Sequence, residues 1–307
     1  MLFNHYFGEW INLYKRGTVA APTLQKYEMT YQRLKELAPD LTLEGLNRGT
    51  YQGVLNAYAA THEKQTVMDF HRHLKACLAD AREDGIITCD PTRKAVVKGK
   101  MPAAKKTKYL SMAELRKLLS VLPLNPEKVG FDWMILLLAK TGLRYAEALA
   151  LTPSDFDLSM QKIYVRKTWN YKFAPYGFAP TKNSSSMRDV SIDAKTATQF
   201  KTLIRDLPEG NPIFVDKGTR IFNSTANNAL ARYCRTAGVP IISAHSLRHT
   251  HASVLIAAGV SIQTVSRRLG HSNTITTQNT YLHIIRELEE RDRDKTMECL
   301  SDLMEGA

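Results

Sequence analysis

His245 and Arg248 are the polar residues whose types and spacing most directly suit the binding of a phosphate. On a helix they stand three residues apart and share one face, whereas Leu247 and Val254 point to another, towards a core. The planar fork of an arginine matches two phosphate oxygens, and an imidazole can donate a further hydrogen bond. This segment is therefore predicted to hold a phosphate on a helix that is otherwise buried.

Four further residues are candidates to complete such a site: Arg144, Lys182, His271 and Tyr281. Arg144 begins a helix, where the simplest interpretation is a surface ion pair with Glu147 that is worth only tenths of a kcal/mol. Lys182 stands beside the turn-forming stretch 183–186. A lysine in a turn usually does no more than aid solubility, although a side chain at this position could also reach into a nearby site. Taken one by one, none of these residues identifies a reaction.

The first 97 residues are predicted to form a helical domain. Apolar residues recur at three- and four-residue steps within 24–37 and again within 67–81. Shorter patterns of the same kind occupy 10–14 and 51–58, so we expect a bundle of about four helices. No catalytic motif occurs here, and a structural or partner-binding role competes with DNA binding for this domain.

Residues 98–108 are predicted to be a basic linker between domains. They contain five lysines and no acidic residue: Lys98, Lys100, Lys105, Lys106 and Lys108. Gly99 and Pro102 interrupt the run, which is typical of a connecting segment. Such lysines are either simply solvated or follow a DNA phosphate backbone, and the sequence leaves both possibilities open.

Residues 109–307 combine helical and β patterns. A capping box at 111–114 begins a helix, and an apolar run covers 131–138. Strands are predicted at 162–167 and 187–192, with a further short one at 213–216. Helical patterns occupy most of the rest: 194–207, 225–237 and the chain beyond. The predicted fold class is mainly α with a small antiparallel β-sheet, an α+β fold.

Charge and composition narrow the function. The chain has 307 residues and a formal net charge of +12, with the excess of Lys and Arg concentrated in 101–281. Such a segment indicates a polyanionic partner, most commonly nucleic acid, and a membrane surface is the weaker alternative. No apolar run is long enough to span a bilayer and no secretory leader is seen, so we expect a cytoplasmic protein. The scattered Cys and His residues complete no familiar zinc ligand set, and no metal or other cofactor is expected.

Residues 258–269 resemble the turn and recognition helix of a lac-type repressor. That interpretation would place Gln263, Ser266 and Arg267 at base edges in the major groove. In those repressors the motif lies at the N-terminus, whereas here it falls late in the chain, among the candidate site residues. We favour the alternative, a helical hairpin packed in the core, with Gly259 supplying the turn conformation.

Taken together and in order, the candidate residues resemble the active-site series of the tyrosine recombinases of the phage integrase family. The resemblance is carried by Thr-Gly-Leu-Arg-x-x-Glu, a hairpin lysine, His-x-Leu-Arg-His-Thr, and Leu-Gly-His followed by a tyrosine, and it covers 110–290. Tyr281 lies ten residues after His271, one more than in many members, as in integrases of conjugative transposons and Gram-positive phages. Residues 1–97 resemble the family's helical core-binding domain only in length and composition.

The resemblance implies cleavage of DNA without a metal. Arg144 and Arg248 would clamp the scissile phosphate, and Tyr281 would attack it to form a 3′-phosphotyrosyl link. A phenol suits this task because its pKa, about 10, makes it a leaving group that a sugar hydroxyl can displace to reseal the strand.

Four other residues receive supporting roles from the resemblance. Lys182 would be the general acid towards the 5′ oxygen, and His245 would assist as general base near the phenol. His271 would donate a hydrogen bond to the phosphate. Glu147 would orient the helix that carries the first arginine, so that its ion pair becomes part of the site.

The resemblance also implies partners and a setting. These are double-stranded DNA with specific recombination sites, a homo-tetramer on that DNA, and an excision or directionality factor, in the bacterial cytoplasm in association with the nucleoid. The acidic tail 282–307 would pack on its own domain or dock on a neighbouring subunit. No small arm-binding domain is seen in 1–20, so either the protein recombines simple sites or such a domain precedes this sequence.

Two other functions compete with recombination. A type IB topoisomerase shares the phosphotyrosine chemistry but relaxes supercoils as a monomer, and the short helical first domain argues against it. A DNA-binding regulator would use residues 258–269 for reading and leave the catalytic residues idle.

Overall fold

The computed structural model describes residues 1–101, 109–172, 174–181, 183–216, 221–282 and 297. The chain divides into two compact units, Met1–Lys105 and Lys106–Ala307. The division falls within the stretch 98–108. No helix among the described residues is both long enough and apolar enough to cross a membrane.

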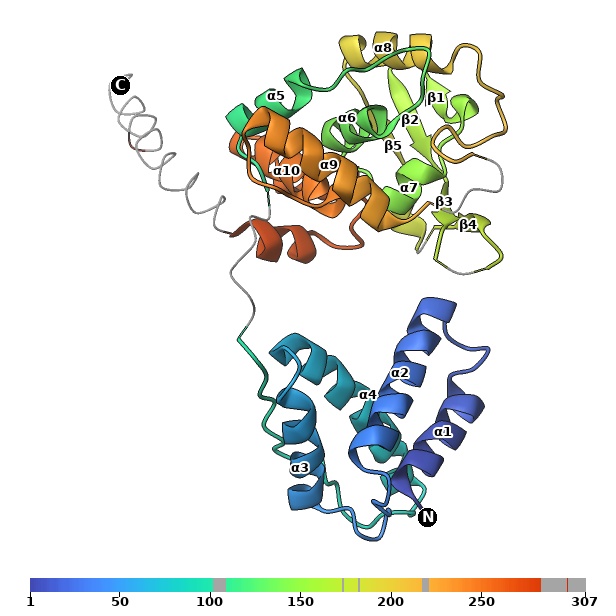
Figure 1. Ribbon diagram of the computed structural model, residues 1–307, viewed down its shortest axis with the longest axis vertical. Helices are drawn as coiled ribbons and strands as arrows, with labels where there is room; N and C mark the ends of the chain where they lie inside the picture. Colours follow the sequence, from blue (N-terminus) through green and yellow to red (C-terminus); the bar gives the residue numbers. More distant parts are fainter. Residues whose placement is uncertain (102–108, 173, 182, 217–220, 283–296, 298–307) are drawn as a thin grey trace, which may run out of the picture. The chain divides into compact units, whose positions relative to one another are not determined.

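Four α-helices make up the described part of the first unit, drawn in blue to teal in Figure 1: α1 (Phe3–Tyr14), α2 (Ala21–Leu37), α3 (Arg48–Ala59) and α4 (Lys64–Glu83). Their apolar faces meet in one core around the fully buried Phe3, Phe7 and Tyr51. The start of α3 is set by Asn47, whose side chain accepts hydrogen bonds from two backbone amides of the first turn. The predicted helical bundle is therefore confirmed.

Among its described residues, the second unit contains seven named helices and two small sheets. The helices are α5 (Met112–Ser120), α6 (Phe131–Thr141), α7 (Tyr145–Leu149), α8 (Ala194–Ile204), α9 (Asn223–Ala237), α10 (Ala244–Ala257) and α11 (Ile262–Leu269). The strands are β1 (Phe156–Asp157), β2 (Lys162–Val165), β3 (Lys167–Asn170), β4 (Gly177–Pro180) and β5 (Arg188–Ser191). Short 3₁₀ turns cover Pro153–Asp155 and Ser184–Ser186, and residues 274–282 are helical. This arrangement confirms the α+β class.

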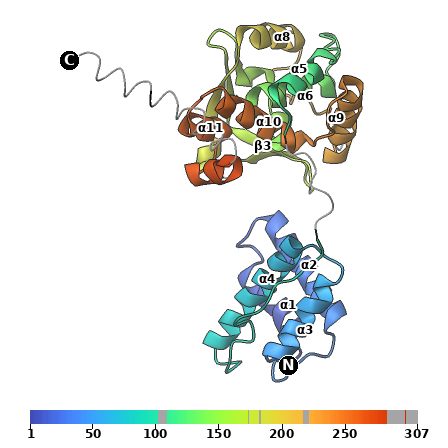
Figure 2. The same ribbon diagram turned by 90° about the vertical axis from the view of Figure 1, so that its left-hand side faces the viewer.

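The buried helix α6 is the centre of the second unit. Almost every residue from Asp132 to Ala139 is buried, as expected for a helix that is apolar all round. It packs against α10, α9 and α7, and Figures 1 and 2 both show α10 beside it. The two polypeptide segments that carry the candidate arginines, α7 and α10, are thus placed on one common support.

The three-stranded sheet directs one arginine inwards. Its order is β1-β2-β5, all antiparallel, and the register places Val165 opposite Arg188 and Ile163 opposite Val190. Because side chains alternate along a strand, Arg188 shares the buried face with Val190, whereas Asp189 is exposed. A buried arginine requires partners, and these belong to the site described below.

One sequence prediction needs correction in this unit, and one element was not foreseen. Residues 213–216 do not form a strand: 213–214 are a turn, and the amide of Ile213 donates to the carbonyl of Leu151 at 2.8 Å. The hairpin of β3 and β4 was not predicted, since its partly exposed strands lack a clear buried face.

We expect replacement of Gly142 by Ala to destabilise the protein by about 2–4 kcal/mol. Gly142 ends α6 with φ +67°, and an added Cβ would lie 2.7 Å from His251 Cδ2 and 2.9 Å from Leu269 Cδ2. Gly238 is a matched control, because it ends α9 with φ +64° and an added Cβ would meet open space. Gly238→Ala should lose only about 1 kcal/mol in urea unfolding, and equal losses would contradict the steric argument.

Candidate functional site

Arg248 is held on the buried side of α10 by two backbone carbonyls. Its side chain is only 3% exposed. Nη1 donates to the carbonyl oxygen of Gly142 at 2.8 Å and Nη2 to that of Leu269 at 2.6 Å. His245, one turn earlier on the same helix, is exposed to solvent. The predicted pair thus lies on one helix, with the arginine fixed and the histidine accessible.

Arg144 comes from a different part of the chain and reaches the same place. It precedes α7, and its Nη1 donates to Oε1 of Glu147 at 2.7 Å. Its Nη2 donates to the carbonyl oxygen of Gly270 at 3.0 Å. About a third of the Arg144 side chain is exposed, so this guanidinium can meet a ligand from outside.

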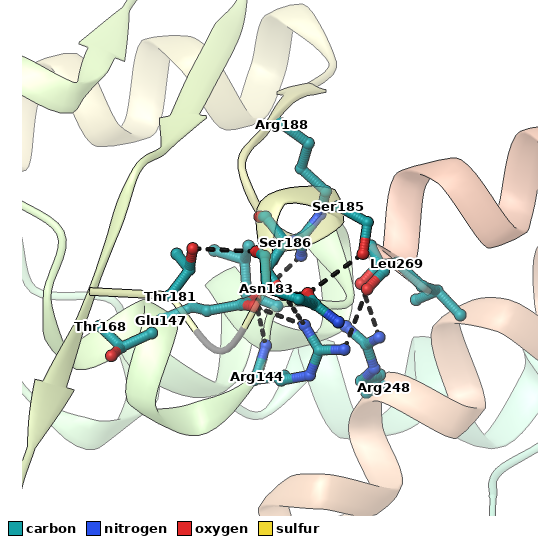
Figure 3. A network of polar contacts seen from close by, with 12 residues as sticks. Arg144, Glu147, Thr168, Thr181, Asn183, Ser185, Ser186, Arg188, Arg248 and Leu269 are labelled. Carbon is teal, nitrogen blue, oxygen red and sulfur yellow. Dashed lines mark hydrogen bonds and ion pairs between the residues drawn. The ribbon is translucent and has the colours of Figure 1, made fainter. Parts of the chain in front are cut away.

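Glu147 lies between two arginines rather than on the surface. The side chain is 1% exposed, and its Oε2 accepts from Arg188 Nη2 at 2.9 Å and from the backbone amide of Arg144 at 2.9 Å. Arg188 is itself buried and also donates through Nε to the carbonyl of Arg268 at 2.6 Å. Figure 3 shows Glu147 joining Arg144 and Arg188. The surface ion pair considered from the sequence is therefore a buried, shared carboxylate.

Three successive carbonyls at the end of α11 receive the three arginines. Arg188 donates to residue 268, Arg248 to residue 269 and Arg144 to residue 270. These carbonyls belong to the last turn of a helix, where no intrahelical amide remains to satisfy them and the helix dipole is negative. The end of α11 therefore suits a cluster of cations that would otherwise repel one another.

The cluster perturbs the acid–base chemistry of its members. Burial, together with the nearby Arg144, lowers the pKa of Arg248 to about 9. Burial alone would raise the pKa of Glu147, but hydrogen bonding and charge attraction from Arg188 and Arg144 outweigh it and lower that pKa. The stabilisation from Glu147 is therefore present above the pKa of an unfolded glutamate, about 4.3, and is lost as the pH falls through the lowered folded value.

Tyr281 is buried in a small cluster beside α10 and α11. It is 2% exposed and packs with Ala252, Ile256, Val265 and Leu269. Burial raises its pKa to about 12, an effect that the positive charge of Arg248 opposes. The phenol therefore keeps its proton at neutral pH. Its oxygen lies 2.9 Å from Nδ1 of His249.

Only some of the remaining predicted site residues lie in the part of the chain that the structure describes. His271 follows the end of α11, its Nδ1 lies 2.7 Å from Thr277 Oγ1, and burial and the nearby arginines lower its pKa to about 4. Lys98 and Lys100 are exposed. The other predicted lysines and almost all of the tail 282–307 lie outside the described residues: Lys105, Lys106, Lys108 and Lys182. In the part of the chain that is described, no group of three or more His, Cys, Asp or Glu could hold a metal ion.

The repressor-like stretch packs as a core hairpin. Val265 and Leu269 of α11 are fully buried, and Ser266 is 3% exposed, so it cannot reach a base edge. Gly259 turns the chain between α10 and α11 with φ +85°. Gln263 and Arg267 are exposed. The favoured interpretation of residues 258–269 is therefore consistent with the structure, and the end of this helix serves the arginine cluster.

Sequence reasoning missed Arg188, His249 and the pair of Arg268 and His251. Arg268 Nε donates to His251 Nε2 at 2.8 Å, and burial lowers the pKa of His251 to about 3. Strand alternation could have drawn attention to Arg188, because it places a charged residue on the face of the apolar Val190. No local pattern marks His249, since its partner lies 32 residues later.

Comparison with known proteins gives consistent matches. Residues 108–287 match the phage integrase family. The integrase of Staphylococcus phage L54a is 23% identical, covering 98% of this chain and 93% of that protein, and the ICEBs1 integrase of Bacillus subtilis is 27% identical over 65% and 56%. Among solved structures, the Tn1549 transposon integrase bound to transposon right end DNA has a TM-score of 0.77 at 21% identity, covering 95% and 99% of the two chains. A λ integrase dimer bound to a COC′ core site has a TM-score of 0.65 at 18% identity, covering 91% and 77%. These structures share the fold.

We expect Arg188→Met to lower the free energy of unfolding by about 3–5 kcal/mol, because it removes one partner of a buried ion pair. Arg166 is the matched control, since its ion pair with Asp189 is nearly half exposed on both sides. Arg166→Met should cost about 1 kcal/mol or less. Urea unfolding followed by circular dichroism measures both, and similar losses would show that the Arg188 pair is not the support inferred here.

Proposed function

The chain belongs to the phage integrase family and is a tyrosine recombinase, and we propose that it cuts and rejoins DNA at specific sites to integrate or excise a mobile element. In this proposal Tyr281 attacks the scissile phosphate and forms a 3′-phosphotyrosyl intermediate. The relatives named as integrases of a phage and of ICEBs1 support the mobile-element assignment. The integrase structures solved with DNA support a DNA substrate.

The observation that carries the proposal is the pair of arginines fixed beside a tyrosine. Arg144 and Arg248 are brought together from positions more than a hundred residues apart by bonds to Gly270 and Gly142. Each guanidinium has five N–H donors, so donors remain for a phosphate. Burial and the positive charge of Arg144 lower the pKa of Arg248 to about 9, so the environment of its charge is unfavourable. An anionic phosphate would compensate that charge.

The charge of the site fits the transition state of strand cleavage. Arg144 and Arg188 form ion pairs with the buried carboxylate of Glu147, and Arg248 lies near enough to feel its charge, so three arginines and one carboxylate leave two positive charges in excess. A phosphodiester carries one negative charge, and the pentacovalent state formed during attack carries about two. The fixed cations are thus matched to the charge that develops, and they need no reorganisation when it does.

The remaining roles complete the proposal. Lys182 protonates the departing 5′ oxygen, His271 donates a hydrogen bond to the phosphate, and the family resemblance gives His245 the role of base near the phenol. Four copies would assemble on two sites, with the acidic tail docking between them and an excision factor setting direction. The phosphotyrosine bond keeps a leaving group of phenolic acidity, so resealing needs no external energy source.

We extend the proposal to a basic cavity on the first unit as a contact for the DNA backbone. This cavity of about 410 Å³ is lined by Arg48, Arg93, Lys94 and Lys98, with no acidic residue among its lining. Gln52 of α3 fixes the segment through two bonds of 2.9 Å to the backbone of Val96. The cations are therefore carried on an anchored segment, which suits repeated contacts with phosphates.

A nicked suicide substrate tests the cleavage chemistry. With a duplex that carries the junction of the element encoding the chain, the wild type should form a covalent protein–DNA adduct that is resolved on a denaturing gel. Tyr281→Phe removes only the attacking oxygen and should form none. Absence of an adduct with the wild type would refute the proposed function.

Two cognate sites in one reaction separate recombination from topoisomerase activity. A recombinase yields products in which strands have been exchanged between the sites. Relaxation of any supercoiled plasmid, without exchange, would instead favour the type IB topoisomerase alternative.

Replacing both Arg93 and Lys98 by Gln should weaken binding of the whole chain to duplex DNA at every sequence. Because two phosphate contacts are lost, the slope of log affinity against log salt should become shallower by about 2. Arg16 and Arg33 are the matched control, since they form ion pairs with Glu28 and Glu36 and do not line this cavity. The same change at these two should leave the slope within about 0.5 of the wild type. Equal effects of the two double variants would refute the assignment of the cavity.

A further inference from the structure

His249 touches the hydroxyl of Tyr281, and the sequence pattern assigns it no role. The phenol oxygen and Nδ1 of His249 are 2.9 Å apart. We propose that His249, rather than His245, is the catalytic base that takes the phenolic proton as Tyr281 attacks the phosphate. This inference rests on the proposed function, since it has meaning only if Tyr281 is the nucleophile.

The environment of Tyr281 makes a base necessary. The side chain is almost fully buried among apolar residues, and its pKa is raised to about 12. At pH 7 roughly one phenol in 10⁵ would then be ionised, so spontaneous ionisation supplies little nucleophile. In the proposal His249 is the tautomer that carries its proton on Nε2, so Nδ1 accepts the hydrogen bond that the protonated phenol donates. The acceptor is already at the distance from which a proton can pass.

The two histidines of α10 face different parts of the site. Their ring centroids are 5.0 Å apart and their planes are nearly perpendicular, at 86°. His245 is open to solvent, and desolvation and the positive charges of Arg248 and Arg144 lower its pKa. The ring of His249 lies with its centroid 6.0 Å from that of Tyr281. Of these two histidines, His249 is therefore the one that α10 presents to the nucleophile.

In the proposed step one proton leaves the phenol of Tyr281 and another reaches the 5′ oxygen. The phenolic O–H bond breaks, its electron pair forms the new O–P bond, and the proton passes to Nδ1 of His249. The P–O5′ bond breaks with its electron pair on the 5′ oxygen, which receives a proton from the general acid of the proposed function. In resealing, the protonated His249 returns its proton to the departing phenolate, so the same residue serves both directions.

His249 is held in place by its neighbour in the chain, Arg248, which is proposed to bind the phosphate. It follows Arg248 directly, and Arg248 is fixed by bonds to Gly142 and Leu269. Leu269 also packs against Tyr281. The base, the clamp and the nucleophile therefore share one support, so the phenol stays in reach of His249 when the phosphate is engaged.

The test compares His249→Asn with His245→Asn in the full chain, as rates of single-turnover cleavage of the nicked substrate. Asn places an oxygen near the Nδ1 position, so it retains a hydrogen-bond acceptor and loses the base. We expect His249→Asn to slow cleavage on the order of 10²–10⁴-fold. Each variant is also made with 3,5-difluorotyrosine at position 281, a more acidic phenol that needs less help from a base. The loss caused by His249→Asn should shrink by at least about tenfold with this phenol, whereas the loss caused by His245→Asn should not change.

Several results would overturn the inference. These are a His249→Asn rate within about threefold of the wild type, a loss that is the same with either phenol, or a loss that shrinks for His245→Asn instead. Thermal unfolding and affinity for the substrate show whether each variant is folded. If His249→Asn does not fold, His249→Gln takes its place. A wild type that forms no adduct refutes the proposed function itself, whereas an adduct with unaffected His249 variants refutes only the inference.

Discussion

The site depends on the way in which α11 ends. Its last turn leaves three carbonyls without amide partners, and each accepts a hydrogen bond from an arginine of a different element: β5, α10 and the segment before α7. Guanidinium groups this close repel one another, and the negative end of a helix dipole is one of the few neutral features that offsets the repulsion. A helix that resembles a DNA-reading element is thereby the organiser of the catalytic charges.

Glu147 complements this arrangement without cancelling it. One buried carboxylate serves Arg144 and Arg188, while Arg248 has only neutral carbonyls as its partners. A second buried carboxylate would stabilise the arginine cluster itself and would weaken its attraction for a phosphate. The excess positive charge is retained where a substrate can meet it, which is the condition for electrostatic preorganisation.

Local patterns were sufficient for some of the site and not for the rest. His245 and Arg248 could be singled out because residue type and helical spacing are properties of short segments, whereas Arg144 was selected only through the family resemblance. Arg188 could be found only with the sheet register, since Glu147 lies 41 residues earlier, and His249 only with the position of the helical residues 274–282. Residues 258–269 show the limit clearly, because a repressor helix and a packed helix share one apolar pattern, and the burial of Ser266 distinguishes them. The prediction of a strand at 213–216 is wrong because a short apolar run in the sequence indicates burial but does not show whether another strand pairs with it.

The left-handed glycines that end α6 and α11, Gly142 and Gly270, link the two arginines through their carbonyl oxygens. Arg248 is fastened to the carbonyl of Gly142, two residues before Arg144, while Arg144 is fastened to that of Gly270, next to the carbonyl that also holds Arg248. The two guanidinium groups thus belong to a closed loop of a few bonds. Because each guanidinium is bonded to the backbone beside the other, moving one arginine away from the other would require breaking at least one of these bonds.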